Sequence, residues 1–205
     1  MFPNVHQVTL AEKGLHIEAL SHEKVVMVIK SNGIYFLREI KELIHDVGGE
    51  SKDPKERPVV ALIQSEDDPT VYWAIPVGDA EHRSVEQMER IQKFIDYPKS
   101  DVRHNYYHVG KTDKTSIFFI SDVVPITPAY IDKEYLTFNS HHYVIKNKQL
   151  LMDLTDKLKR ILSFEQSKIK QSGKFYFRQN IYGIYEMMLS ENKLFNELHN
   201  NSIEE

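Results

Sequence analysis

The chain of 205 residues contains no cysteine. Disulfide bonds, thiolate zinc sites and cysteine nucleophiles are therefore excluded together, and the composition fits a reducing compartment. No apolar run approaches the roughly 18 residues that a membrane-spanning helix needs. Residues 1–13 also lack the basic start and apolar core of a signal peptide. We therefore expect a cytoplasmic protein.

Glycine is scarce, with eight residues and no phosphate-loop or dinucleotide fingerprint among them. No HExxH or comparable metal motif is present. Asp101, His104 and His108 could still ligate a cation, and His141-His142 adds more imidazole, but their spacing matches no metal-ligand pattern. We expect no metal and no cofactor.

The charge is unevenly distributed along a chain of ordinary composition, with 41% apolar and 27% charged residues. The net charge is −4, yet residues 145–180 hold nine basic and three acidic residues, a net +6. Such a block can attract phosphate backbones, although a solvated helix face is the commoner reason for it. No repeat, low-complexity tract or linker divides the chain, so we expect one domain.

The strongest strand signal lies in residues 117–120, an almost wholly apolar run between polar flanks. This pattern is typical of a strand buried on both faces. A second apolar run follows over 123–126. Because side chains alternate along a strand, an extended segment over 104–109 would place His104 and His108 on one face. His108 and Lys111 would then flank a surface turn that contains Gly110.

The remaining periodicities predict strands with intervening helices. Strand patterns cover 23–30, 57–63 and 71–77, and helical patterns cover 35–45, 84–95, 147–162 and 178–189. Ser84 and Gln87 match a capping box, Asn32-Gly33 is a turn signal, and Trp73 suits a core or rim anchor. Residues 125–144 look mostly irregular. This order indicates an α+β fold with a mainly antiparallel sheet.

The order of elements resembles a known family, the ToxN/AbiQ toxins of type III toxin-antitoxin systems. The resemblance covers residues 34–162 and rests on YFLREIKELI, on KERPVVALI, on the strand YWAIPV, on the capped helix, on SIFFISDVVPI and on the long helix after it. It implies a compact MazF/Kid-like (SH3-like) barrel with peripheral helices. An N-terminal strand-rich extension would cover 1–33, and a C-terminal helical extension 163–205.

The same resemblance implies a function in phage defence. Such a protein is a metal-independent, sequence-specific endoribonuclease that cuts mRNA and is inhibited by a small structured repeat RNA. Its partners would be these RNAs, in an assembly that can become cyclic, without DNA or membrane. One departure matters: the family has Thr-Ser-Pro-Lys after its Ala-Pro-Leu strand, whereas the corresponding stretch here, residues 74–83, reads AIPVGDAEHR and contains neither serine nor lysine. Only Arg57, ahead of a buried strand, corresponds by position to a family residue.

Metal-free RNA cleavage needs a base for the 2′-hydroxyl, a cation for the phosphorane and an acid for the 5′-oxygen. The candidates for catalysis are His108, Lys111, Arg57 and His82, and the candidates for RNA binding are Arg83, Tyr106, Tyr107, Lys146, Lys148, Lys157 and Arg160. His82 and Arg83 open a helix whose first amides favour a phosphate. Histidine more often bonds to backbone, and tyrosine in strands more often packs. A second hypothesis, motivated by the missing motif, is a catalytically inactive RNA- or protein-binding module.

Overall fold

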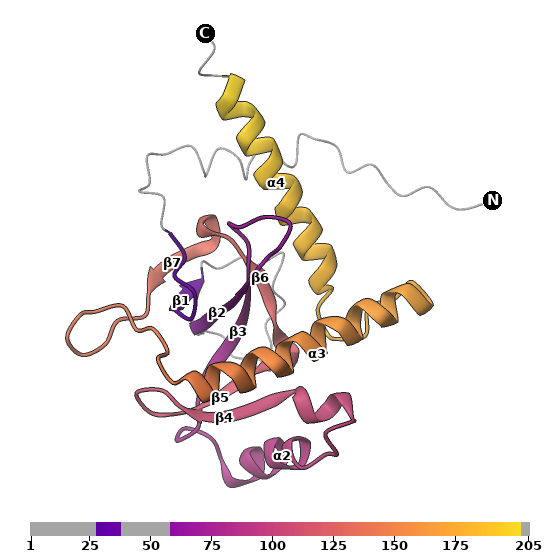
Figure 1. Cartoon of the computed structure of the whole chain (residues 1–205). Coiled ribbons are helices and arrows are strands. Elements are labelled where there is room, and N and C mark those ends of the chain that lie inside the picture. The colour runs from indigo at the N-terminus through magenta and orange to yellow at the C-terminus, as the bar shows by residue number, and fades with distance from the viewer. Residues whose placement is uncertain (1–27, 38–57, 202–205) are drawn as a thin grey trace.

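The computed structural model of the chain describes residues 28–37 and 58–201 (Figure 1). Its main feature is an antiparallel sheet with the strand order β4-β5-β3-β2-β1-β7, in which β6 pairs with β3 off this path. The strands are β1 (Ile34–Leu37), β2 (Pro58–Gln64), β3 (Tyr72–Asp79), β4 (Tyr107–Lys111), β5 (Thr115–Phe119), β6 (Val124–Ile126) and β7 (Ile131–Glu134). The helices are α2 (Val85–Ile95), α3 (Lys148–Ser172) and α4 (Ile181–Asn201).

The predicted α+β class with an antiparallel sheet is confirmed. Within the described residues the sheet is open, because β4 and β7 end the path and no pairing joins them. The closed barrel therefore stays a prediction. None of the described helices is long and apolar enough to cross a membrane.

Strand β3 is the centre of the sheet because it has partners along both edges. On one side it pairs with β2, and on the other its first half pairs with β6 and its last three residues, Val77 to Asp79, pair with β5. Pro58 is the first residue of β2, where a missing amide donor is tolerated. The end of β3 is thus fixed beside the start of β5.

The main core lies between the sheet and α3, which crosses it (Figure 1). Leu154, Leu158 and Ile161 of α3 are fully buried, and Phe118 of β5 is fully buried in the same cluster. Trp73 is confirmed as a core anchor, since it is 7% exposed and stacks on Tyr185 of α4 at 4.8 Å between ring centroids. Helix α3 is longer than predicted and ends at Gly173, whose φ of 67° is easiest for glycine.

The helix predicted over 35–45 is wrong for its first residues, which form β1 between β2 and β7. Tyr35 is fully buried, and its hydroxyl accepts the Lys30 amide at 2.6 Å. The rest of this segment, like most of the strand predicted over 23–30, lies outside the described residues. The Asn32-Gly33 turn is confirmed, with Asn32 at φ 65°.

The extended segment predicted over 104–109 is also wrong at its start. Residues Val102–Asn105 form a 3₁₀ helix, and β4 begins only at Tyr107. Gly110 lies inside β4, paired with Ser116, so the hairpin turn is at residues 112–114. Residues 125–144 are less irregular than expected because they contain β7 and most of β6.

Candidate active site

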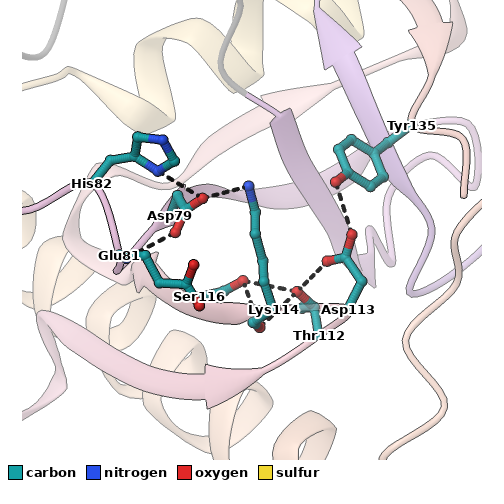
Figure 2. A network of polar contacts seen from close by, with 8 residues as sticks. All are labelled: Asp79, Glu81, His82, Thr112, Asp113, Lys114, Ser116 and Tyr135. Carbon is teal, nitrogen blue, oxygen red and sulfur yellow. Dashed lines mark hydrogen bonds and ion pairs between the residues drawn. The ribbon is translucent and has the colours of Figure 1, made fainter. Parts of the chain in front are cut away.

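Asp79, the last residue of β3, is the centre of a polar network (Figure 2). Its Oδ2 accepts a hydrogen bond from Lys114 Nζ at 2.6 Å and lies 2.9 Å from His82 Nδ1. Its Oδ1 accepts the Glu81 amide at 2.8 Å. One carboxylate therefore holds a lysine and a histidine that are 32 residues apart in the chain, Lys114 and His82.

Strand pairing explains why these groups meet. Asp79 is opposite Ser116 in the β3–β5 ladder, and the Ala80 amide donates to Thr115 O at 3.0 Å just beyond it. The turn before β5 therefore lies beside the loop after β3. That loop closes tightly, with the Arg83 amide donating to Ala80 O at 3.2 Å, before α2 begins.

The capping box predicted for α2 is confirmed and fixes the end of this loop. The Gln87 amide donates to Ser84 Oγ, and the Ser84 amide donates to Gln87 Oε1. The capping box satisfies two backbone amides at the start of the helix, so α2 begins at a fixed point directly after His82 and Arg83.

A second arm of the network runs through the β4–β5 turn to β7 (Figure 2). Thr112 Oγ1 is 2.8 Å from Ser116 Oγ and donates to Asp113 Oδ1 at 2.9 Å. Asp113 Oδ2 accepts from the Tyr135 hydroxyl at 3.0 Å, just past the end of β7. The turn that carries Lys114 is thus attached to the sheet at two places.

The contact between Asp79 and Lys114 favours the charged form of both groups. The hydrogen bond from Lys114 is the main reason that the pKa of Asp79 is lowered to about 2, with a further bond from the Glu81 amide. The same contact raises the pKa of Lys114. Burial, and then the hydrogen bond to Asp113, raise the pKa of Tyr135, so its hydroxyl stays a donor. The result is an ionised carboxylate beside an ammonium group.

Arg83 follows His82 in the chain but packs against a different group. Its guanidinium lies over the Phe119 ring, 5.4 Å from the centroid, where a cation is attracted to the ring face. Gly78 makes this packing possible, because a Cβ there would be 2.8 Å from Phe119 Cε2 and 3.3 Å from Arg83 Nη2. Since Gly78 and Asp79 face opposite sides of β3, the network at Asp79 combines a carboxylate with a histidine and a lysine, and Arg83 lies outside it.

The structure describes three of the four residues proposed for catalysis and does not bring these three into one network. His82 lies in the network, whereas Arg57 directly precedes β2 and is outside the described residues. Lys111 is exposed at the end of β4, paired with Thr115. His108 is the second residue of β4 and lies three residues before Lys111, so the two side chains point to opposite faces of one strand and do not flank a turn. They cannot act together on one phosphate.

His108 faces α3 and is half-buried, unlike the surface position predicted for it. Burial lowers its pKa, and the nearby Lys157 ammonium lowers it further against the opposing effect of Asp153. Gly110, on the same face of β4, is packed against Leu150 of α3. These contacts belong to the sheet–helix interface.

The two tyrosines proposed for RNA binding pack against other aromatic rings. Tyr106 stacks on Phe94 at 5.5 Å and meets Phe177 at 5.8 Å, and Tyr107 meets Phe119 edge-on at 5.8 Å. Burial raises the pKa of both hydroxyls. Neither ring offers an open face of the kind that stacks a base.

The proposed basic residues divide into two groups. Lys157 Nζ donates to His104 O at 3.1 Å and Tyr107 O at 2.9 Å, and Arg160 Nη1 donates to Lys99 O at 3.0 Å. These two tie α3 to the backbone. Lys146 and Lys148 are exposed near the start of α3. Arg83, already described, directly follows His82 in the chain and packs against Phe119.

The residues considered for a cation site are dispersed. His104 lies in the 3₁₀ helix, and its Nδ1 atom is 2.8 Å from Ile95 O. It therefore does not share a strand face with His108. Asp101 accepts from Arg103 at 2.6 Å. Across residues 28–37 and 58–201, no group of three or more histidine and acidic side chains could hold a metal ion.

Sequence reasoning identified one half of the site and missed the other. Asp79, His82 and Arg83 stand together in the sequence, and the polar turn before the apolar run was also noted. Lys114 was missed because its contact with Asp79 follows from the pairing of β3 with β5, which no local pattern encodes. No protein-family model and no curated protein sequence matches the chain.

Proposed function

We propose that this protein is a metal-independent endoribonuclease that cleaves RNA by attack of the 2′-hydroxyl on the adjacent phosphorus. The observation that carries the proposal is the cluster of His82 and Lys114 around Asp79. These are the side-chain types that the reaction needs, held on two neighbouring loops of the sheet.

His82 is the general base in this proposal. Asp79 can only accept a hydrogen bond, so the Nδ1 atom 2.9 Å from it carries the proton of the neutral ring. Nε2 is then the basic nitrogen, and the side chain is 83% exposed, so a ribose hydroxyl can reach it. An aspartate that fixes the tautomer and orientation of a histidine is the usual support for such a base.

Lys114 supplies the positive charge in this proposal, and Arg83 is a candidate for a further phosphate contact outside the network. The 2′-oxygen gives its proton to His82 as it bonds to phosphorus, and the bond from phosphorus to the 5′-oxygen then breaks. Lys114 stabilises the phosphorane and protonates the departing oxygen, which as an alkoxide is far more basic than an amine. The products are a 2′,3′-cyclic phosphate and a 5′-hydroxyl. His108 has no role in this scheme, and Arg57 stays a candidate for a further cation.

The network also brings together a lysine and hydroxyl groups, which the sequence directly after β3 lacks. The family's Thr-Ser-Pro-Lys provides a hydroxyl and a lysine there. Here Lys114 reaches Asp79 from the β4–β5 turn, and the hydroxyls of Thr112 and Ser116 lie in the same network. This favours a retained activity over a catalytically inactive module.

We extend the proposal to a type III toxin that acts on mRNA and is inhibited by a small repeat RNA. The support is the resemblance in element order from the strand at 58–64 to the long helix α3, together with the net +6 charge of residues 145–180; the first segment of the resemblance, YFLREIKELI, begins as strand β1 and lends no support. The pairing of β3 with three other strands is compatible with the curved sheet of a MazF/Kid-like barrel. Two observations test the toxin: growth arrest on expression, and a short tandem-repeat array upstream of the reading frame.

The competing function is an inactive binding module on the same fold. The observation in its favour is that Asp79 pairs with both Lys114 and His82, as a purely structural ion network would. Such a module would bind RNA or a protein in a salt-sensitive way without turnover and without growth arrest.

The nuclease function is tested by incubating the protein with RNAs of mixed sequence in EDTA. We expect discrete fragments with 2′,3′-cyclic phosphate ends, and no cut at a nucleotide whose 2′-hydroxyl is methylated. Intact RNA across a broad range of sequences contradicts the proposal, and fragments with 3′-hydroxyl ends exclude the mechanism.

A further inference from the structure

The two ends of the open sheet meet at one side-chain hydrogen bond. Strands β4 and β7 end the pairing path, with β5, β3, β2 and β1 between them. Nevertheless the hydroxyl of Tyr135, the residue directly after β7, donates to Asp113 Oδ2 at 3.0 Å in the turn between β4 and β5. The sheet is therefore curved enough to bring its two ends together, and within the described residues this bond joins them where no backbone pairing does.

Tyr135 is fixed from the β7 side of this contact. Its amide donates to Ile34 O at 2.9 Å, and its carbonyl accepts the Tyr143 amide at 2.8 Å. Its ring packs against the main core, with its centroid 5.8 Å from that of Phe36 and 6.2 Å from that of Tyr143. The hydroxyl therefore extends from a part of the sheet whose position does not depend on the β4–β5 turn.

The turn itself is exposed and depends on contacts with other elements. Thr112 closes it, since its amide donates to Lys114 O at 2.9 Å and its hydroxyl donates to Asp113 Oδ1 at 2.9 Å. The side chains of Asp113 and Lys114 reach two other strands: Asp113 bonds to Tyr135 and Lys114 bonds to Asp79 (Figure 2). The turn is thus held on one side just past β7 and on the other at the end of β3.

The bond from Tyr135 bears on the place of the neighbouring lysine. Asp113 and Lys114 are consecutive residues, so a displacement of one moves the other. An ammonium group on a flexible four-carbon side chain keeps a defined place only if its backbone does. Burial, and then the bond to Asp113, raise the pKa of Tyr135, so this contact is made by a neutral donor that adds no charge to the network.

We infer that Tyr135 is a positioning residue, which through Asp113 holds the β4–β5 turn so that the Lys114 ammonium group stays beside Asp79. The reaction in which Lys114 then takes part rests on the proposed nuclease function. The placement of Lys114 does not.

The first test is the pKa of Asp79 in Tyr135→Phe, measured by carboxyl NMR. Because tyrosine and phenylalanine are both neutral here, a change in this pKa reports a change in the position of Lys114 and not a lost charge. The pKa of Asp79 rises part of the way from about 2 to its ordinary value of 3.8. Lys114→Met, which lacks the ammonium group altogether, sets the upper limit of the rise.

A second measurement needs no acid. At about pH 6 the hydrogens of the Lys114 ammonium group exchange faster with water in Tyr135→Phe, because a looser contact with Asp79 opens more often. Tyr143→Phe is the matched control, since Tyr143 lies edge-on to Tyr135 and no hydrogen bond joins its hydroxyl to Asp113 in the part of the chain that the structure describes. The control leaves both quantities at the wild-type value, and both variants melt within about 4 °C of the wild type.

RNA cleavage gives a third measurement. Tyr135→Phe lowers kcat about tenfold with little change in KM, because a displaced Lys114 is lost mainly from the transition state. Asp113→Ala removes the acceptor of the same hydrogen bond. Adding Tyr135→Phe to Asp113→Ala therefore changes neither kcat nor the Asp79 pKa any further.

An Asp79 pKa and a hydrogen exchange that stay unchanged in Tyr135→Phe overturn the inference. An equal change in Tyr143→Phe, or a further change when Tyr135→Phe is added to Asp113→Ala, overturns it as well. A raised Asp79 pKa in a protein that does not cleave RNA supports the positioning and rejects the proposed nuclease. Cleavage by the wild type with an unchanged Asp79 pKa in Tyr135→Phe rejects the positioning alone.

Discussion

Replacement of Lys157 by methionine tests whether this lysine stabilises the fold or binds RNA. Lys157 Nζ donates to His104 O and Tyr107 O, so it ties α3 to the start of β4. Each hydrogen bond from a charged donor is worth about 1.5–3 kcal/mol. Two effects reduce the loss of stability. Burial of the ammonium group, which lowers the Lys157 pKa, costs free energy that methionine avoids. Water can also hydrogen-bond to the two carbonyls that Lys157 releases. We expect Lys157→Met to lower the free energy of unfolding by about 1–2 kcal/mol.

The assay has two parts, urea unfolding followed by circular dichroism and the salt dependence of binding to non-cleavable RNA. Lys148→Met is the matched control, since Lys148 is an exposed lysine on the same helix. It should change stability by less than about 0.5 kcal/mol. Lys157→Met should leave unchanged the slope of the logarithm of the binding constant against the logarithm of the salt concentration. A variant with wild-type stability and a slope reduced by about one would refute the structural role, because that reduction is the effect of losing one phosphate contact.

Three further predictions concern the core and the ionised groups. Phe118→Ala should lower the free energy of unfolding in urea by about 3–5 kcal/mol, and a loss below about 1 kcal/mol would contradict its burial. Carboxyl NMR should give Asp79 a pKa of about 2, and Lys114→Met should raise this pKa. The contribution of the Asp79 carboxylate to stability is then complete above its unfolded pKa of about 4 and is lost as pH falls toward 2. Because the folded pKa of His108 is lowered, the wild type should lose stability as pH falls below about 6.5, and His108→Gln should show a shallower loss between pH 7.5 and 5.

Most elements of the sheet could be predicted because their local patterns agree with their environment. The apolar runs of β2, β3 and β5 and the capping box of α2 each specify one structure. The segment from Tyr35 was misassigned because its apolar residues fit a helical stripe as well as a strand. Pairing with β2 and β7, which buries Tyr35 completely, decided in favour of the strand.

The candidate site was only half predictable for a related reason. His82 and Arg83 could be found because they stand together ahead of a recognisable helix start. His108 was predicted at the surface because the sequence pattern places the hairpin turn at Gly110. The turn is at residues 112–114, so His108 lies within β4. The link from Asp79 to Lys114 depends on which strands pair, and spacing along the chain does not determine that.

The most direct test of the central claim compares RNA cleavage in EDTA by the wild type, by His82→Ala and by His108→Gln. The wild type should produce 2′,3′-cyclic phosphate ends, and His82→Ala should be slower by about 10²-fold or more because the general base is removed. His108→Gln should cleave at nearly the wild-type rate, since His108 lies at the interface with α3. Wild-type activity in a folded His82→Ala variant, or a loss confined to His108→Gln, would contradict the account.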